Sequence, residues 1–385
     1  MDHLLNPLVK KVEISGIRKF YNLVSGNKNM ISLTIGQPDF PTPDHIKTAA
    51  KQAIDNNYTV YTHNAGDIEL RKAVSAYISG KYQLQYDPDQ EIIVTSGASE
   101  AIDITFRTIL TPGVEVILPG PVYPGYEPII KMCGATPIYA DITQTGFRMT
   151  ADIIEGLLTP NTRCIVLPYP SNPTGVTLTA EELQDIAALI KDKEIFILAD
   201  EIYSELVYEK EHTSIASYLR QQTIVLNGLS KSHSMTGWRI GFLFAPAVIA
   251  QEILKVHQYN VTCASSISQS AALAAVTDGY DDAVPMKMEY AKRRDYVYNR
   301  LLNMKLNVIK PDGAFYFFIQ LPEGFSTSLS FCLELVEKAG VAVVPGNAFS
   351  ELGEGYFRLS YAYSMDTLIE AMNRMETFLS NKTNY

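Results

Sequence analysis

The chain is organised around the run GLSKSHSMTGWRIG, residues 228–241. Lys231 follows small residues there, and Arg239 comes eight positions later in a second small, rigid segment. An amine attacks a carbonyl only when it is neutral, so a nucleophilic lysine needs a close-fitting pocket. A surface lysine in a polar loop is the ordinary alternative. The residues around this run therefore decide whether Lys231 is a nucleophile in a pocket or an ordinary surface lysine.

Seven short apolar runs lie before and after this lysine and mostly alternate with stretches of helical spacing. They are Glu91–Thr95, Val114–Leu118, Thr136–Ala140, Arg163–Leu167, Ile195–Ala199, Thr223–Leu226 and Ile240–Phe244. Such alternation predicts an α/β fold with a mainly parallel sheet. Only about a dozen residues separate Leu226 from Ile240, barely enough for a parallel crossover, so we expect the last strand to be antiparallel.

The chain after residue 245 has a different pattern and predicts a second, smaller α+β domain. Long helical segments are expected around 246–275 and 281–303, then short strands and a helix up to Tyr363, and a last helix over about 365–379. The apolar, aromatic run Gly313–Phe318 is expected to be a core strand, and packing alone is enough to explain it. The predicted division is 1–45 for an N-terminal arm with part of the small domain, 46–284 for the large domain and 285–385 for the small domain.

Composition and charge exclude several classes of function. The 385 residues carry a net charge of −10 and no basic stripe, which argues against nucleic acid and anionic membranes as partners. No apolar run approaches the roughly 18 residues of a transmembrane helix, and the N-terminus does not resemble a signal peptide. Four scattered cysteines favour reduced core thiols over disulfides or a metal site. We expect a soluble, cytoplasmic enzyme without a metal.

Small residues between a predicted strand and helix predict an anion site. In the run TSGASE, residues 95–100, Ala98 and Ser99 would expose backbone N–H groups at a helix N-terminus, which attracts phosphate. Alone this signal is weak, because many strand-to-helix turns are rich in glycine and serine. Arg239 could add a bidentate guanidinium and Ser230 a hydroxyl.

Three polar residues come just after predicted strands. Asn172 lies in the proline-rich run YPSNPTG, Asp200 ends an apolar run, and Lys231 follows the next one. Open α/β sheets bind their ligands at the carboxyl ends of the strands, so we expect these side chains to share one edge of the sheet. Taken singly, Asn172 could be a turn residue and Asp200 a helix cap.

Four runs (NPTG at 172–175, DEIY at 200–203, SK at 230–231 and GWRIG at 237–241) resemble, in order and spacing, the class I, fold-type I aminotransferases, which use pyridoxal phosphate (PLP). The resemblance covers essentially the whole chain. It implies a seven-stranded large domain, a PLP Schiff base on Lys231 and a pairing of Asp200 with the pyridine nitrogen. One difference is Gly228, where many relatives carry a serine that contacts the phosphate.

The same resemblance implies roles for the remaining candidates. Tyr203 and Asn172 would contact the phenolic oxygen of the ring, and Tyr123 would stack on it. Ala98, Ser99, Ser230 and Arg239 would hold the phosphate, and Tyr61 would reach the phosphate of the partner subunit in a homodimer. Gly36, Asn172 and Arg358 would bind the substrate carboxylate.

Three further runs, 33–40, 227–234 and 256–260, resemble a branch of the family that transfers an amino group between an N-acetylated diamino diacid and 2-oxoglutarate in lysine biosynthesis. The alternatives are a broad-specificity aspartate or aromatic aminotransferase and a PLP-dependent C–S β-lyase. A non-catalytic PLP-binding regulator is disfavoured, because residues 1–30 are too short and too weakly basic for a DNA-binding domain.

Overall fold

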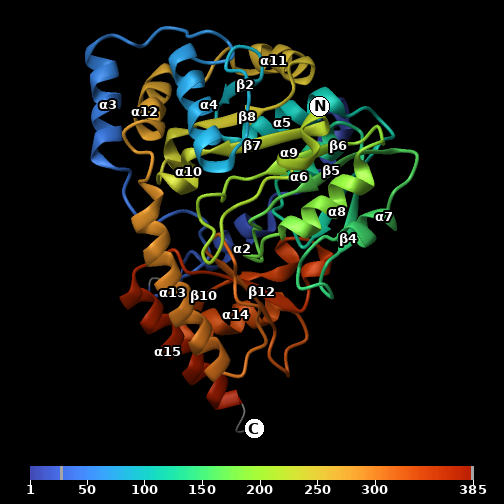
Figure 1. The fold of residues 1–385 in the computed structure, drawn as a ribbon. Helices are drawn as coiled ribbons and strands as arrows, with labels where there is room; N and C mark the ends of the chain where they lie inside the picture. The colour runs from blue at the N-terminus through green and yellow to red at the C-terminus, as the bar shows by residue number, and fades with distance from the viewer. Residues whose placement is uncertain (27–28, 383–385) are drawn as a thin grey trace.

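The computed structural model describes residues 1–26 and 29–382 and contains one large sheet and two small ones (Figure 1). The strands of the large sheet are β2 (Ile92–Thr95), β3 (Glu115–Gly120), β4 (Thr136–Asp141), β5 (Thr162–Leu167), β6 (Phe196–Asp200), β7 (Thr223–Gly228) and β8 (Gly241–Phe244). Their order is β2-β8-β7-β6-β5-β3-β4. Only β8 runs antiparallel to its neighbours, β2 and β7. The predicted seven-stranded, mainly parallel sheet and its reversed last strand are confirmed.

Both faces of the large sheet are covered by helices, which explains why its strands read as nearly continuous apolar runs. In β6, for example, Ile197 faces one core and Leu198 the other, and both are fully buried. One face carries α4 (Ile68–Tyr82), α7 (Ala151–Glu155), α8 (Ala180–Ile190), α9 (Ala216–Leu219) and α12 (Ser266–Val276), and α3 (Asp44–Asp55) packs on the outer side of α12 (Figure 1). The opposite face carries α5 (Ala98–Ile109), α6 (Tyr126–Met132) and α11 (Ala247–Val261).

Helix α8 shows how local sequence sets these elements. It begins at a capping box, in which the side chain of Thr179 accepts a hydrogen bond from the Glu182 backbone N–H and Glu182 returns one to the Thr179 N–H. Its apolar residues Leu183, Ile186 and Ile190 recur at helical spacing and are buried against the sheet.

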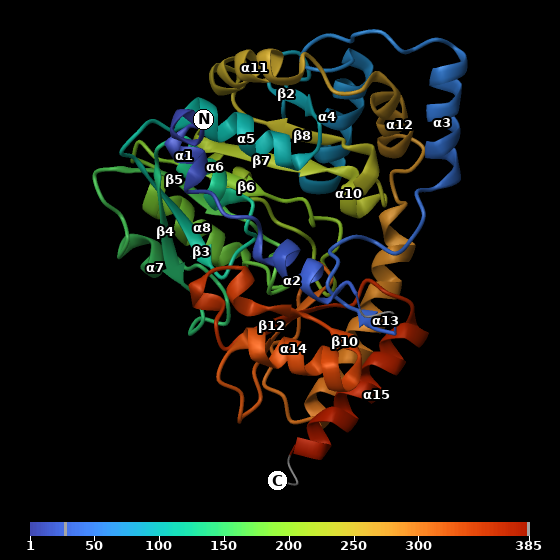
Figure 2. The same cartoon turned by 180° about the vertical axis from the view of Figure 1, so that it is seen from behind.

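A second region with its own core packs below the large sheet (Figures 1 and 2). It contains the three-stranded sheet β11-β12-β9, the two-stranded sheet β1-β10 and three helices. The elements are β1 (Ile31–Ser32), β9 (Tyr316–Gln320), β10 (Val341–Ala342), β11 (Val344–Pro345), β12 (Tyr356–Ser360), α13 (Ala283–Asn303), α14 (Ser328–Ala339) and α15 (Met365–Lys382). β1 pairs in parallel with β10, so the N-terminal segment contributes to this core.

The N-terminal segment runs along the outside of the molecule between the two regions. It contains η1 (Asp2–Leu4), α1 (Pro7–Lys10) and α2 (Gly16–Val24). Figure 2 shows α1 near α6 beside the large sheet and α2 above the small sheets. The short connections are α10 (Leu229–Ser232), η2 (Arg220–Gln222), η3 (Thr236–Trp238), η4 (Gly346–Ala348) and η5 (Glu351–Gly353).

Two expected elements differ in the structure. The helical segment predicted around 246–275 is split into α11 and α12, because Thr262 after α11 has a left-handed φ of 68° and Ser265 caps α12. The strand predicted over Gly313–Phe318 begins only at Tyr316, since Ala314 has a φ of 53° that a strand does not allow.

The proposed division of the chain at residues 45 and 284 stays a prediction. The first boundary falls in the first turn of α3, which begins at Asp44, and the second falls at the start of α13, which begins at Ala283. We propose that α13 links the two regions. Among residues 1–26 and 29–382, no helix combines the length and the apolar character needed to cross a membrane.

Candidate active site

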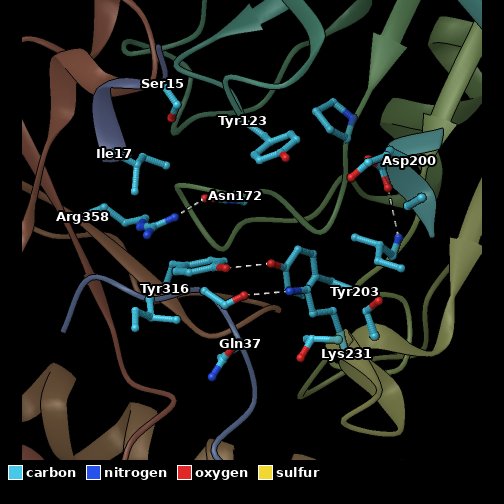
Figure 3. A pocket seen from close by; sticks show the side chains of 18 of the residues that line it. Ser15, Ile17, Gln37, Tyr123, Asn172, Asp200, Tyr203, Lys231, Tyr316 and Arg358 are labelled. Carbon is cyan, nitrogen blue, oxygen red and sulfur yellow. Dashed lines mark hydrogen bonds between the residues drawn. The ribbon is translucent and has the colours of Figure 1, made fainter. Parts of the chain in front are cut away.

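A cavity of about 710 Å³ lies at the carboxyl edge of the large sheet, facing the small sheets and the N-terminal segment (Figure 3). Asp200 ends β6, Asn172 follows β5, and Lys231 lies in α10 directly after β7, as the spacing predicts. All the predicted site residues except Tyr61 line it, namely Gly36, Ala98, Ser99, Tyr123, Asn172, Asp200, Tyr203, Ser230, Lys231, Arg239 and Arg358. The structure thus brings together side chains separated by up to 322 positions.

The amine of Lys231 is hydrogen-bonded inside the cavity, and its pKa is lowered. Its Nζ donates a 2.7 Å hydrogen bond to the carbonyl oxygen of Gly36, which comes from the N-terminal segment. Burial lowers the pKa of Lys231 to about 8, and the guanidinium groups of Arg358 and Arg239 act in the same direction, while Asp200 opposes them. A larger share of the amine is therefore neutral near pH 7 than for an exposed lysine, as a nucleophile or proton carrier requires.

Asp200 supplies a buried carboxylate at the inner end of the cavity. The hydroxyl of Tyr126 donates a 2.6 Å hydrogen bond to its Oδ2, and the backbone N–H of Ile202 lies 3.3 Å from its Oδ1. Burial raises the pKa of Asp200, and these two hydrogen bonds only partly counteract it. In the described part of the chain Asp200 forms no ion pair, so a cationic group of a ligand would stabilise its charge.

The start of α5 and Arg239 form a small cradle for an anion. Gly97 precedes the helix with a φ of 83°, and a Cβ at this position would lie 2.4 Å from Nη2 of Arg239. The glycine therefore lets the guanidinium approach the helix N-terminus, where the backbone N–H groups of Ala98 and Ser99 are found. Nη1 of Arg239 donates a 2.9 Å hydrogen bond to the carbonyl oxygen of Thr236, which fixes the side chain.

Gly228, the position where the chain differs from many relatives, is tightly packed. A Cβ there would lie 3.0 Å from the carbonyl oxygen of Ile240 and 3.1 Å from Cα of Gly241, across the β7–β8 pair. A serine would need these backbones to move apart. The close pairing of β7 and β8 thus leaves little room at position 228 for a side chain that could bind the phosphate.

Arg358 lies on β12, opposite the sheet edge, and is fully buried. Its Nη1 donates to Oδ1 of Asn172 at 2.8 Å and its Nη2 to the carbonyl oxygen of Thr34 at 2.5 Å. Its Nε has no hydrogen-bond partner in the described part of the chain although it is buried. An unpaired buried N–H on a cation is costly, and a ligand carboxylate would satisfy it.

Tyr203 and Tyr316 meet between the two sides of the cavity, with a 2.7 Å hydrogen bond between their hydroxyls (Figure 3). Tyr316 lies in the run predicted to be a core strand, and it is buried in the core of the small region while it also lines the cavity. Its position also explains Gly36, since a Cβ at 36 would lie 2.2 Å from the Tyr316 hydroxyl.

Sequence reasoning missed further residues of the cavity. Tyr126, whose hydroxyl donates to Asp200, was not among the predicted site residues. Ser15, Ile17 and Arg18 reach the cavity from α2 and the residue before it. The only signal for them is the helical spacing of 16–24, which marks a helix but not what it faces.

Tyr61 does not line the cavity of its own chain, and 82% of its side chain is exposed. It lies in a loop that hydrogen bonds hold against Thr262 and the start of α12. Asn64 Nδ2 donates to the carbonyl oxygen of Thr262 at 2.7 Å, and Ser266 Oγ donates to that of Tyr58 at 2.9 Å. The exposed tyrosine is thus displayed by an ordered loop.

The sequence profile described as "Aminotransferase class I and II" matches residues 28–375. The chain is 64% identical to a protein of Bacillus subtilis (strain 168) named "Probable N-acetyl-LL-diaminopimelate aminotransferase", over 99% of this chain and 97% of that one. The structure is similar to that of Pyrococcus protein A1, with a TM-score of 0.95, 38% identity and 98% of each chain covered. It also matches aspartate aminotransferase from Thermus thermophilus with maleate, with a TM-score of 0.92, 32% identity and 97% and 99% covered.

Proposed function

Because this chain belongs to the class I and II aminotransferases and is thus a PLP-dependent transferase, we propose that its cavity binds PLP at Lys231 and transfers an amino group from N-acetyl-L,L-2,6-diaminopimelate to 2-oxoglutarate. The observation that carries the proposal is the presence of a half-buried lysine, a buried carboxylate and a buried arginine in one cavity. Their pKa shifts and open hydrogen-bonding positions favour a reaction site over a structural cluster.

The residues of the cavity fit this cofactor. The carboxylate of Asp200 would pair with the protonated ring nitrogen, and the cradle of Ala98, Ser99 and Arg239, with Ser230 beside it, would bind the phosphate. Tyr123 would pack on the ring. Tyr203 and Asn172 would bind its phenolic oxygen. Burial raises the pKa of Tyr203 well above the usual value, so its hydroxyl stays protonated and can donate a hydrogen bond.

PLP, when bound, takes up the electrons that are released as the substrate loses its Cα proton. Asp200 keeps the ring nitrogen protonated, because an adjacent negative charge favours the charged form of that nitrogen. The amine of Lys231, once free, carries the proton at its Nζ to and from the reacting carbon. Its lowered pKa matches this task, since a base that titrates near the working pH can both accept and return a proton.

Arg358 fixes the orientation of the substrate. Its planar guanidinium, held by Asn172 and Thr34, would bind the α-carboxylate with two hydrogen bonds. Tyr316 packs its ring 4.5 Å from the guanidinium carbon and limits its movement. A substrate held in this way presents the same bond for cleavage in each turnover, which lowers the entropic part of the barrier.

The acetylated substrate is supported by the name of the 64% identical Bacillus subtilis relative and by chemistry. A free amine in a 2-amino-6-oxo diacid attacks its own ketone and closes a six-membered imine, whereas acetylation removes that nucleophile. Gln37 lines the cavity, and its amide makes no hydrogen bond to any residue that the structure describes. It is thus available to pair with the acetamide.

Turnover of a panel of amino donors with 2-oxoglutarate tests the proposal, with glutamate formation as the readout. The acetylated compound is expected to have the highest kcat/KM, since polar groups built for its amide would be left unpaired by other donors. Equal or faster turnover of aspartate, alanine or aromatic amino acids would leave only the general aminotransferase. A broad-specificity aspartate or aromatic aminotransferase is the second candidate function. A relative named "Aromatic-amino-acid aminotransferase 2", to which the chain is 38% identical, favours it. Release of pyruvate and ammonia from cystathionine in the same panel would reveal a β-lyase.

We also propose that two copies form a homodimer in which Tyr61 completes the partner's phosphate site. Apolar residues are exposed on this loop, with 63% of Tyr58 and 73% of Val60 accessible, and on helix α11, which contacts the loop and whose Tyr259 is 88% accessible. Exposed apolar residues on an ordered surface are typical of an interface. Mixing inactive Tyr61→Ala and Lys231→Ala proteins should restore part of the activity. A monomeric mass, or no recovery after reassembly, would contradict shared sites.

A further inference from the structure

Helix α2 forms part of the wall of the cavity. Phe20 and Val24 are buried in the core of the small region, and Gly16 packs so closely on η4 that a Cβ would lie 2.9 Å from Cβ of Ala348. These contacts fix the helix against the small sheets. Arg18 and Tyr21, three residues apart and so on one face of the helix, line the cavity.

Arg18 differs from the other two arginines of the cavity. Arg239 and Arg358 are held by hydrogen bonds to neighbouring groups. Arg18 is exposed, and its guanidinium has no hydrogen bond or ion pair with residues 1–26 or 29–382. It is thus a cation of the cavity without a partner in the protein.

The cavity holds one more arginine than the phosphate and the α-carboxylate use. Among the described lining residues Asp200 is the only carboxylate, against Lys231 and three arginines. In the proposed reaction Arg239 serves the phosphate and Arg358 the α-carboxylate, so the third guanidinium remains unused. The amino donor and 2-oxoglutarate each carry a further carboxylate, which loses its hydration when it enters the cavity and needs a cation in return.

We propose that Arg18 binds the distal carboxylate of dicarboxylate substrates in both halves of the reaction; this rests on the proposed function. Glutamate has a five-carbon chain and diaminopimelate a seven-carbon chain, so the distal group reaches different depths. The long side chain of Arg18, on an exposed helix face, can move with the distal carboxylate. Its planar guanidinium can form two hydrogen bonds to that carboxylate in each position.

The proposal is tested by substrate pairs that differ only at the distal end. Glutamate and norvaline have the same carbon chain, and norvaline carries a methyl group where glutamate has a carboxylate. Single-turnover half-reactions of the holoenzyme give the half-saturating concentration of each, and 2-oxoglutarate and 2-oxopentanoate are compared in the return half-reaction. Arg18→Gln should raise the values for glutamate and 2-oxoglutarate by roughly 10- to 100-fold and leave norvaline and 2-oxopentanoate nearly unchanged. Arg18→Lys should restore part of the loss, since it keeps the charge but not the fork.

Lys19→Gln is the matched control. Lys19 is the next residue of the same helix, pairs with Glu13 at 2.6 Å and does not line the cavity, so its loss should change none of the four values. If Arg18→Gln affects norvaline as strongly as glutamate, Arg18 only supports the helix and the proposal is wrong. No change for glutamate contradicts it as well. If the wild-type enzyme does not use the acetylated donor, the proposed substrate fails, but the glutamate and norvaline values still decide the role of Arg18.

Discussion

The two sides of the cavity are built in different ways. On the sheet side, Asp200 and Lys231 follow buried parallel strands, so the rigid sheet fixes their positions. On the other side, Arg358 is held by Thr34, which is 324 positions away, and α2 and β9 complete the wall. The groups proposed for the chemistry thus lie on the sheet, and most of those proposed for substrate binding lie on segments that pack against it. Substitutions on the first side should mainly lower kcat and those on the second mainly raise KM.

The largest effect is expected for Lys231→Ala. The variant loses both the amine that holds the cofactor and the proton carrier, so turnover should fall to background. General acid–base catalysis alone accounts for about 10²- to 10⁴-fold. The visible absorbance of lysine-bound PLP should disappear as well, and steady-state assays with absorption spectra check both. Lys255→Ala, which removes a surface lysine of α11, should behave as wild type. Wild-type spectrum and rate in Lys231→Ala would refute the site.

Asp200→Ala should come next. The variant should still bind PLP, because Lys231 and the phosphate cradle remain. Its turnover should nevertheless fall by several orders of magnitude, each tenfold step corresponding to about 1.4 kcal/mol in the barrier, since an unprotonated ring is a poor electron acceptor. Asp200→Asn keeps the shape and an oxygen for the Tyr126 hydroxyl, so an equal loss there attributes the effect to the charge. Near-normal turnover in either variant would show that another group protonates the ring.

Arg358→Lys sharpens the contrast from the substrate side. A lysine keeps the charge but cannot form the planar pair of hydrogen bonds, and it leaves Asn172 and the Thr34 carbonyl without their donor. KM should rise by roughly 10- to 100-fold for amino and oxo substrates alike, with a smaller change in kcat. Steady-state kinetics of both half-reactions measure this. A defect in only one half-reaction would mean that Arg358 reads a side chain instead of the α-carboxylate.

The sheet side could be predicted from the sequence because its information is local. Short apolar runs that each end in a polar residue predict buried strands with side chains at one edge, and Asn172, Asp200 and Lys231 lie there. The reversal of β8 follows from the short connection after Leu226. Roles within the cofactor site came from resemblance, and they remain proposals.

The opposite side could not be predicted in the same way, because its contacts join distant segments. Tyr316 lies in an apolar, aromatic run that gives no sign of the left-handed φ of Ala314 or of the hydrogen bond between Tyr316 and Tyr203. Gly16 allows α2 to approach Ala348, a contact that no periodicity reveals. The break at Thr262 has no glycine or proline to mark it. Such positions depend on tertiary packing.

The smallest effect is expected at the junction of the two sides, the hydrogen bond between Tyr203 and Tyr316. Tyr316→Phe removes one hydroxyl of a buried pair, and a net worth of about 0.5–1.5 kcal/mol predicts a loss of roughly 2- to 10-fold in kcat/KM. Tyr203→Phe should cost more, because its hydroxyl is also proposed to contact the cofactor. The double variant should cost less than the sum of the two single losses, since either substitution already breaks the shared bond.

Tyr361→Phe provides the matched control for this cycle. Its hydroxyl donates a 3.1 Å hydrogen bond to the carbonyl oxygen of Ala314, and the residue is buried in the small region without lining the cavity. It should lower the thermal midpoint and leave kcat/KM nearly unchanged. Strictly additive losses for Tyr203 and Tyr316 would mean that the bond does not couple the two sides. A coupling that appears in kcat/KM but not in thermal stability would mean that the hydrogen bond stabilises the enzyme–substrate complex more than the free fold. In that complex the chemistry of the sheet side and the binding of the opposite side must act together.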